Sequence, residues 1–323
     1  MNNRLNWLSF LFTAILIVST FLSKADNSTK KSVSFQEDIK NSSLIASVQP
    51  NFISTQKPEQ SILNTAFNTE LELKPLKKEG VVNPALTAKI AYAKDLDSQK
   101  DFYASGTEKH WPIASISKLM TALIASEKVG IDKTVIISQS AIDTEGSAGN
   151  FKENEKYSIK DLIKIMLFVS SNDAAEAISE FYGKDAFVKE MNSEAVKIGM
   201  LQTNYNDCTG LSVLNQSTTS DLTKLAEYIL KEKPEIFEYT KNKELSVVEL
   251  SSNSVKFFTN INTFAGQPDF LGGKTGFIDS SEQNLLSLFN YKGHKILTII
   301  LGSEDRSSDT QKLLDWVKNS YIF

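Results

Sequence analysis

The order of strand-like and helix-like segments is the feature that most constrains how this 323-residue chain can fold. Residues 85–97 and 100–106 resemble two strands joined by a polar turn. Apolar residues at helical spacing then dominate, and after about residue 245 short strands return before a final amphipathic helix. This order indicates an α+β fold, in which an antiparallel sheet is flanked by helices and a helical segment is inserted into it.

The inserted helical subdomain is expected to cover about residues 126–232. Helical patterns are found at 116–129, 158–168, 173–182, 184–198, 219–231 and 309–321, and the later strand patterns at 245–250, 254–260, 284–291 and 295–302.

The N-terminal segment leaves two alternatives open. Arg4 precedes an uncharged run, residues 5–22, which as a helix would span about 27 Å, just short of a hydrocarbon core of roughly 30 Å. Small residues at Ser23 and Ala25 would permit cleavage of residues 1–25 as a signal peptide. The run is longer than the usual apolar region of a signal peptide, which favours an uncleaved membrane anchor. Both alternatives predict that the rest of the chain is exported.

Residues 26–77 are expected to form a flexible polar linker, and residues 78–323 the folded domain. The linker region is rich in Ser, Asn, Gln and Lys and has no sustained apolar period. Fifty-odd flexible residues have an end-to-end distance of roughly 40 Å, so the folded domain would work at some distance from a membrane.

Composition excludes several classes of function. The net charge of −4 and a pI near 5.5 give no electrostatic reason to expect a nucleic acid as partner. Cys208 is the only cysteine, so neither an intrachain disulfide nor a thiolate metal cluster can form. His110 and His294 are the only histidines, which excludes His-rich zinc sites. We therefore expect neither a metal nor a cofactor.

Ser115 and Lys118 form the first candidate catalytic pair. On a helix, residues three apart share a face, so the two side chains can touch. A serine hydroxyl needs a base, and a lysine can be that base if burial and neighbouring positive charge lower its pKa. The spacing alone proves nothing, because Ser28 and Lys31 repeat it within the polar linker.

Two further motifs follow in order. Ser170 and Asn172 lie in a short polar loop that opens a helix, with Asp173 expected to cap it. Lys274, Thr275 and Gly276 lie on a strand-like stretch whose glycines permit close approach of a ligand. S-x-x-K, S-x-N and K-T-G in this order are the set found in penicillin-binding proteins and class A β-lactamases. The ordered set is far more specific than any member, since a second S-x-N at residues 251–253 lacks the helix-opening context.

With these motifs, residues 80–320 resemble the low-molecular-mass penicillin-binding proteins, the serine D-alanyl-D-alanine carboxypeptidases. Residues 191–211 and the "KLLDW" segment at 312–316 also resemble stretches of that family. The resemblance implies a fold of the β-lactamase/transpeptidase type. It also implies a serine D,D-peptidase on the extracytoplasmic face of the bacterial cell membrane. Such an enzyme cleaves peptidoglycan stem peptides through an acyl-enzyme and is inhibited covalently by β-lactam antibiotics.

The resemblance also implies roles for individual residues. Ser115 would attack the carbonyl of the D-Ala-D-Ala bond, and Lys118 would accept its proton. Lys274 would stay protonated to attract the substrate carboxylate. The remaining expected roles are proton relay and substrate holding by Ser170 and Asn172, carboxylate binding by Thr275 and Arg306, and an oxyanion hole formed by the backbone N–H groups of Ser115 and Phe277, next to Gly276.

The sequence also has features that bear on alternatives to a serine D,D-peptidase. After Phe277 the chain reads "IDSSEQN", where the family has a Thr and an Ala-Gly pair, which puts the strand edge and substrate fit in doubt there. A β-lactamase lacks support because no segment after Asn172 resembles the one that carries the deacylating glutamate. "GGKT" is not a P-loop, since Pro268 stands where a glycine belongs. A triad through His110 and an inactive cell-wall-binding relative are further alternatives. Carboxypeptidase and endopeptidase activity remain equally open.

Overall fold

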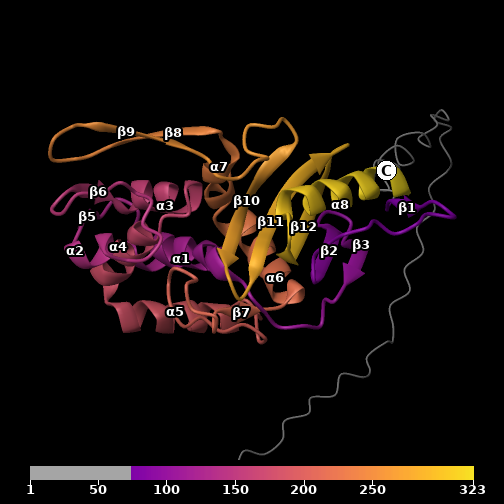
Figure 1. Cartoon of the computed structure of the whole chain (residues 1–323), viewed down its shortest axis with the longest axis horizontal. Helices are drawn as coiled ribbons and strands as arrows, with labels where there is room; N and C mark the ends of the chain where they lie inside the picture. Colours follow the sequence, from indigo (N-terminus) through magenta and orange to yellow (C-terminus); the bar gives the residue numbers. More distant parts are fainter. Residues whose placement is uncertain (1–73) are drawn as a thin grey trace, which may run out of the picture. The chain divides into compact units, whose positions relative to one another are not determined.

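A five-stranded antiparallel sheet with the strand order β10-β11-β12-β2-β3 is the central element of the computed structural model, which describes residues 74–323 (Figure 1). The N-terminal hairpin and the C-terminal strands meet in the middle of the sheet, where Tyr92 of β2 pairs with Ile299 of β12. This architecture confirms the expected α+β fold. The sheet strands are β2 (Ile90–Asp95), β3 (Lys100–Ser105), β10 (Phe270–Ile278), β11 (Glu282–Tyr291) and β12 (His294–Ser303).

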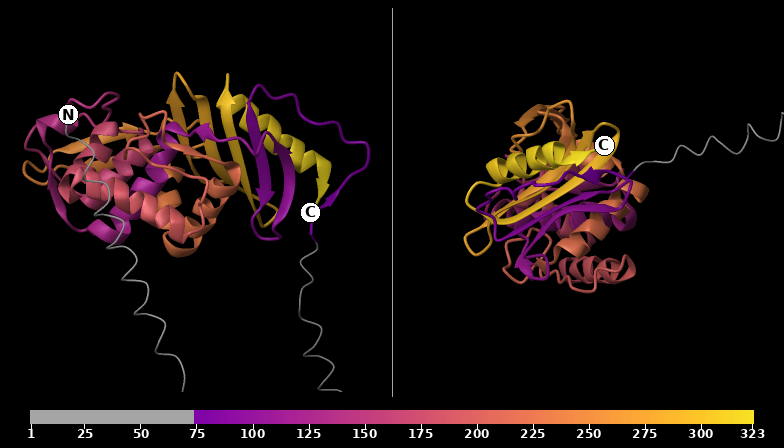
Figure 2. Two further views of the ribbon diagram at one scale, coloured as in Figure 1. Left: turned by 90° about the horizontal axis from the view of Figure 1, so that it is seen from below. Right: turned by 90° about the vertical axis from the view of Figure 1, so that its right-hand side faces the viewer.

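Helices cover both faces of this sheet, because alternate residues of its strands are apolar on each side. The C-terminal helix α8 (Arg306–Ser320), in yellow, lies along one face (Figure 2). On β12, Leu297 and Ile299 pack in the cluster of the helical block, whereas Ile296 and Ile300 pack in the cluster that contains α8. The helices are α1 (Lys118–Ile124), α2 (Gln139–Ile142), α3 (Ile159–Phe168), α4 (Asn172–Tyr182), α5 (Lys184–Lys197), α6 (Thr219–Glu232), α7 (Glu235–Lys241) and α8 (Arg306–Ser320).

The single helix expected at residues 116–129 is three elements in succession. It begins as the 3₁₀ turn η1 (Ala114–Ser117), continues as α1 and ends in the π turn η2 (Ala125–Val129). All side chains of α1 are buried, which makes it the central helix of the block. Gly130, at φ +99°, ends the segment because this backbone conformation favours glycine.

Short strand pairs join the loops of the molecule. The pair β4–β7 matters most for function, because it holds the chain just before Ser115 against residues that follow α5. Helix α7 and most of these short strands were not predicted. The pairs are β1 (Leu76–Lys77) with β13 (Tyr321–Ile322), β4 (Trp111–Pro112) with β7 (Gln216–Ser217), β5 (Thr134–Ile136) with β6 (Lys156–Ser158), and β8 (Glu244–Val248) with β9 (Val255–Thr259).

Asp309 of α8 fastens the segment before β2 to the end of the chain. Its Oδ2 accepts hydrogen bonds from Thr87 N at 3.0 Å, Thr87 Oγ1 at 2.7 Å, Ala88 N at 2.9 Å and Ser303 Oγ at 2.7 Å. A buried carboxylate with this many donors holds the two ends of the domain together.

The predictions for residues 1–25 and most of the linker lie outside the described residues. Within residues 74–323, no helix combines the length and the apolar character needed to cross a membrane.

Candidate active site

Ser115 and Lys118 lie where η1 passes into α1. Ser115 is partly exposed, whereas Lys118 is fully buried. Lys118 Nζ lies 3.0 Å from Ser115 Oγ, so the two side chains are in hydrogen-bonding contact. The preceding residue, Ala114, has φ +48°, an uncommon conformation for a residue with a side chain. The backbone is therefore bent sharply at the point that presents the serine.

Two further acceptors complete the surroundings of the Lys118 ammonium group. Asn172 Oδ1 and the carbonyl oxygen of Thr209 each lie 2.5 Å from Nζ. The Asn172 amide is oriented by its own Nδ2, which donates to the carbonyl of Glu145 at 2.7 Å. Burial lowers the pKa of Lys118 to about 8, which makes its neutral form accessible near neutral pH.

The three neighbours decide what the neutral amine can do. An amide oxygen and a backbone carbonyl can only accept hydrogen bonds, so the two protons of the neutral Lys118 amine are directed at Asn172 and Thr209. Of these three contacts, only the Ser115 hydroxyl can donate a proton to the lone pair that remains. The arrangement therefore suits transfer of the Ser115 proton to Lys118.

Ser170 and Lys274 form the second part of the site. Lys274 Nζ donates to Ser170 Oγ at 2.8 Å and to the carbonyl of Thr275 at 2.8 Å. Lys274 is buried and no carboxylate contacts it among the described residues. Burial, with help from the charges of Lys118 and Arg306, holds its pKa well below the usual range.

The direction of this shift works against the charged form on which the expected role of Lys274 depends. Its charged form is disfavoured because all of its contacts are neutral oxygens and its charged neighbours are positive. A ligand carboxylate bound beside it would supply the missing counter-charge and raise its pKa.

The cap of α4 is Ser171, not Asp173 as predicted. Ser171 Oγ accepts from the backbone N–H of Ala174 at 3.1 Å, which is the usual N-cap bond. Asp173 instead binds the neighbouring loop, accepting from Ala148 N at 3.1 Å and Gly149 N at 3.0 Å. Ser170, at φ +57°, turns the chain immediately before this cap. The turn directs Ser170 to Lys274 and lets Asn172 reach Lys118.

Strand β10 lies at the free edge of the sheet and faces η1. The N–H of Gly273 points away from β11, since it donates to Thr240 Oγ1 at 2.9 Å. Alternation along a strand then places the N–H groups of Thr275 and Phe277 on the same free edge. A Cβ on Gly276 would lie 2.7 Å from the carbonyl oxygen of Ile113 and 3.3 Å from Ser115 N. Only glycine lets β10 approach Ser115 this closely.

Arg306 also contacts strand β10. Its Nη1 donates to the carbonyl of Gly276 at 3.0 Å, and the residue is partly buried at the start of α8. The structure therefore places three basic side chains, Lys118, Lys274 and Arg306, around the K-T-G strand. Strand β10 continues to Ile278, so the unusual sequence after Phe277 does not interrupt the strand edge.

Sequence reasoning missed the loop that follows α5. Thr209 supplies the carbonyl that binds Lys118, and the side chain of Asp207 folds the loop by accepting from Thr209 N and Gly210 N. Gly210, at φ +85°, lies against the backbone of Ala114, where a Cβ would meet its oxygen at 2.0 Å. The sequence "NDCTG" carried a signal for this turn, because an Asp followed by Thr and Gly favours an Asx turn.

The residues on which the alternative sites would depend do not form those sites in the structure. His110 is exposed and its Nε2 contacts Gln202 Oε1 at 2.8 Å, and within residues 74–323 no carboxylate pairs with it to form a triad. The second S-x-N, Ser251–Asn253, lies in the turn between β8 and β9. Strand β10 carries on past Thr275 with no helix, which excludes a phosphate-binding P-loop.

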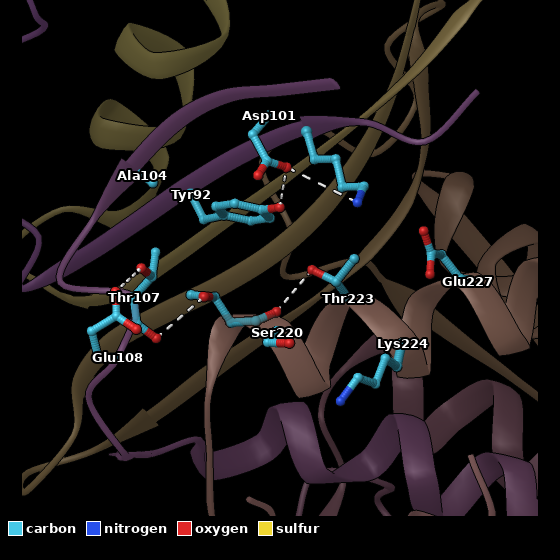
Figure 3. Close-up of a pocket in the computed structure, with 11 residues that line it drawn as sticks. Tyr92, Asp101, Ala104, Thr107, Glu108, Ser220, Thr223, Lys224 and Glu227 are labelled. Atoms are coloured by element: carbon cyan, nitrogen blue, oxygen red, sulfur yellow. Dashed lines mark hydrogen bonds and ion pairs between the residues drawn. The ribbon is translucent and has the colours of Figure 1, made fainter. Parts of the chain in front are cut away.

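A separate cleft of about 480 Å³ lies between β2, β3 and α6 (Figure 3). None of its lining residues belongs to the motifs. Many of its polar groups are paired within the protein, as with the Tyr92 hydroxyl and Asp101 at 2.5 Å and with Lys224 and Asp221 at 2.8 Å. The candidate catalytic groups are therefore those around Ser115 and not those of this cleft.

Comparison with known proteins supports the same family. A family model described as D-alanyl-D-alanine carboxypeptidase, of peptidase family S11, matches residues 77–305. The chain is 27% identical over 270 residues to a D-alanyl-D-alanine endopeptidase of Pseudomonas aeruginosa, which covers 80% of this chain and 87% of that protein. It is 27% identical over 248 residues to the D-alanyl-D-alanine carboxypeptidase DacF of Bacillus subtilis, which covers 72% of this chain and 63% of DacF.

Solved structures share the fold. A D-alanyl-D-alanine carboxypeptidase from Mycobacterium tuberculosis matches with a TM-score of 0.68 at 22% identity, over 76% of this chain and 96% of that one. The Streptomyces K15 DD-transpeptidase matches with a TM-score of 0.68 at 23% identity, over 74% of this chain and 100% of that one. The family model matches well over half of the chain. The chain therefore belongs to the peptidase S11 D-alanyl-D-alanine carboxypeptidase family, whose members resemble low-molecular-mass penicillin-binding proteins.

Proposed function

We propose that this protein is an active serine D,D-peptidase that cleaves D-alanyl bonds of peptidoglycan stem peptides and is acylated by penicillin. The observation that carries the proposal is the contact of Ser115 Oγ with the buried Lys118 Nζ, at 3.0 Å, beside the K-T-G strand. Ser115 gives its proton to Lys118 as Oγ bonds to the carbonyl carbon of the penultimate D-alanine. The leaving amine takes up a proton as the C–N bond breaks, and water later hydrolyses the ester.

The remaining residues have roles that fit their positions. Backbone N–H groups of Ser115 and Phe277 stabilise the oxyanion, and Asn172 holds both Lys118 and the substrate amide. The terminal carboxylate binds near Lys274, Thr275 and Arg306, where its negative charge favours the protonated form of Lys274. A β-lactamase is less well supported, because no segment after Asn172 resembles the one that carries the deacylating glutamate.

Endopeptidase activity is a second candidate. The Pseudomonas aeruginosa and Escherichia coli relatives named as D-alanyl-D-alanine endopeptidases are 27% and 29% identical to this chain. Such an enzyme would cut the cross-link between two stem peptides, using the same serine on a larger leaving group.

Digestion of purified muropeptides distinguishes the two activities. The full-length protein is incubated with a monomeric pentapeptide and with a D,D-cross-linked dimer, and the products are identified by mass spectrometry. We expect release of D-alanine from the first, conversion of the second to monomers, or both. A Ser115→Ala control removes every product. If neither substrate is cut by folded protein that binds penicillin, the peptidase proposal is wrong.

We also propose that the apolar segment, residues 5–22, anchors the exported protein to the membrane. Its length and lack of charge motivate this proposal. Full-length protein is expected to sediment with membranes and to keep Met1 or a residue near it. Sequencing of the mature N-terminus is the measurement, and a mature chain that starts at Asp26 would identify the segment as a cleaved signal peptide.

A further inference from the structure

The loop between α5 and β7 has a carboxylate at its centre. Asp207 Oδ1 accepts from Thr209 N at 2.7 Å, Thr209 Oγ1 at 2.9 Å and Gly210 N at 2.5 Å, and its Oδ2 accepts from Ser212 N at 2.7 Å. Four donors on one side chain fix the path of residues 207–212.

The same loop is fastened to the catalytic segment at three points. The Thr209 carbonyl accepts from Lys118 Nζ at 2.5 Å. The carbonyl of Cys208 accepts from Thr121 Oγ1, one turn along α1 from Lys118, at 2.6 Å. Asn215 Nδ2 donates to Ser117 Oγ at 3.0 Å and to the Asp207 carbonyl at 2.9 Å. The loop therefore holds η1 and α1 at Ser117, Lys118 and Thr121, directly after the nucleophile.

We propose that Asp207 is a positioning residue for the acylation step: its carboxylate folds residues 207–212 into a clamp that holds Lys118 against Ser115. The proposal rests on the proposed function of that pair and assigns a role to a residue outside the three motifs. The link runs through the backbone, because the atom that binds Lys118 is the Thr209 carbonyl and not its side chain.

The negative charge of Asp207 has a second effect, which acts on the pKa of Lys118. A nearby negative charge favours the ammonium form, so Asp207 raises the pKa of Lys118 while burial lowers it to about 8. The other groups around Lys118 differ in their effect. Cys208 stays a neutral thiol, because burial raises its pKa. The Asp173 carboxylate accepts hydrogen bonds from backbone N–H groups. Lys274 contributes positive charge when it is protonated.

Two substitutions separate position from charge. Asp207→Asn keeps the shape and the Oδ1 atom that accepts three of the four bonds but removes the charge, so the pKa of Lys118 is expected to fall below its wild-type value. Asp207→Ala leaves the four donors without their acceptor and loosens the clamp, and we expect acylation by penicillin to slow by about 10²-fold at every pH. Asp185→Asn is the matched control, because it makes the same change at an exposed carboxylate of α5 outside the loop.

The measurement combines an NMR titration of the lysine side chains, with Lys118 assigned from the Lys118→Arg spectrum, and the pH profile of acylation. Asp207→Asn is expected to lower the midpoint of both, whereas Asp185→Asn leaves both at the wild-type value. A folded Asp207→Ala protein that is acylated at the wild-type rate, or a Lys118 pKa that shifts equally in Asp207→Asn and Asp185→Asn, overturns the proposal. Because the titration needs no turnover, a Lys118 pKa that shifts in Asp207→Asn, when the wild type is never acylated, would refute the proposed function and keep the link between Asp207 and Lys118.

Discussion

Replacing Ser115 with alanine is expected to abolish covalent labelling by penicillin and all hydrolysis of D-alanyl peptides. The substitution removes the only atom that can form the acyl-enzyme at this site, and loss of such a nucleophile costs on the order of 10⁶-fold in rate. The structure around residue 115 should hardly change, because Ser115 is partly exposed and its hydroxyl contacts Lys118. The fold is therefore expected to survive.

Ser28→Ala is the matched control, because Ser28 and Lys31 have the same spacing in the polar linker. It should label as the wild type does, with mass spectrometry of the labelled peptide locating the adduct on Ser115. Labelling that persists in a folded Ser115→Ala protein would show that another residue is the nucleophile.

Lys118→Arg is expected to slow acylation by about 10²–10⁴-fold, the usual loss of rate when general base catalysis is removed. Arginine keeps the positive charge but cannot give up its proton in a protein, so it cannot accept the proton of Ser115. Lys274→Arg is the comparison. Arginine can still meet a carboxylate there, so this variant is expected to keep a measurable fraction of the acylation rate.

The pH dependence sharpens this comparison. The base form of Lys118 is the neutral amine, so acylation by the wild type should rise with pH up to about 8 and level off above it. A permanent charge at position 274 disfavours the protonated form of Lys118, so the rise should occur at lower pH in Lys274→Arg. Acylation rates of both folded variants from pH 5 to 9 provide the measurement. Equal losses, or a Lys118→Arg protein that acylates well, would show that Lys118 is not the base.

The sequence predicted most of the secondary structure because strong periodicity marks the long elements. The helical pattern at 158–168 matches α3, and the strand pattern at 284–291 lies within β11. Local competition explains the misses. Residues 116–129 carry one continuous helical pattern, yet tertiary contacts tighten the start into a 3₁₀ turn and widen the end into a π turn.

The residues of the candidate site could be predicted from the sequence only where a side chain makes the contact. The three motifs named the residues that the structure brings together, because serine, lysine and asparagine side chains carry the chemistry. The Thr209 contribution was not visible, since a backbone carbonyl can come from any residue type and only the fold brings it to Lys118. The lowered pKa of Lys274 was not predicted either, because burial without a counter-ion cannot be read from the motif.

The position of β2 between β3 and β12 has a consequence for biosynthesis. Ser115 leaves the ribosome long before β10, β11 and β12, and the buried contacts of Asp309 with Thr87 and Ala88 require almost the whole domain to have been made. Pairings this distant in sequence form slowly, because loop closure costs entropy before any contact repays it. A growing chain would thus lack its central sheet, and with it the K-T-G strand beside Ser115, until almost all of the domain has been made.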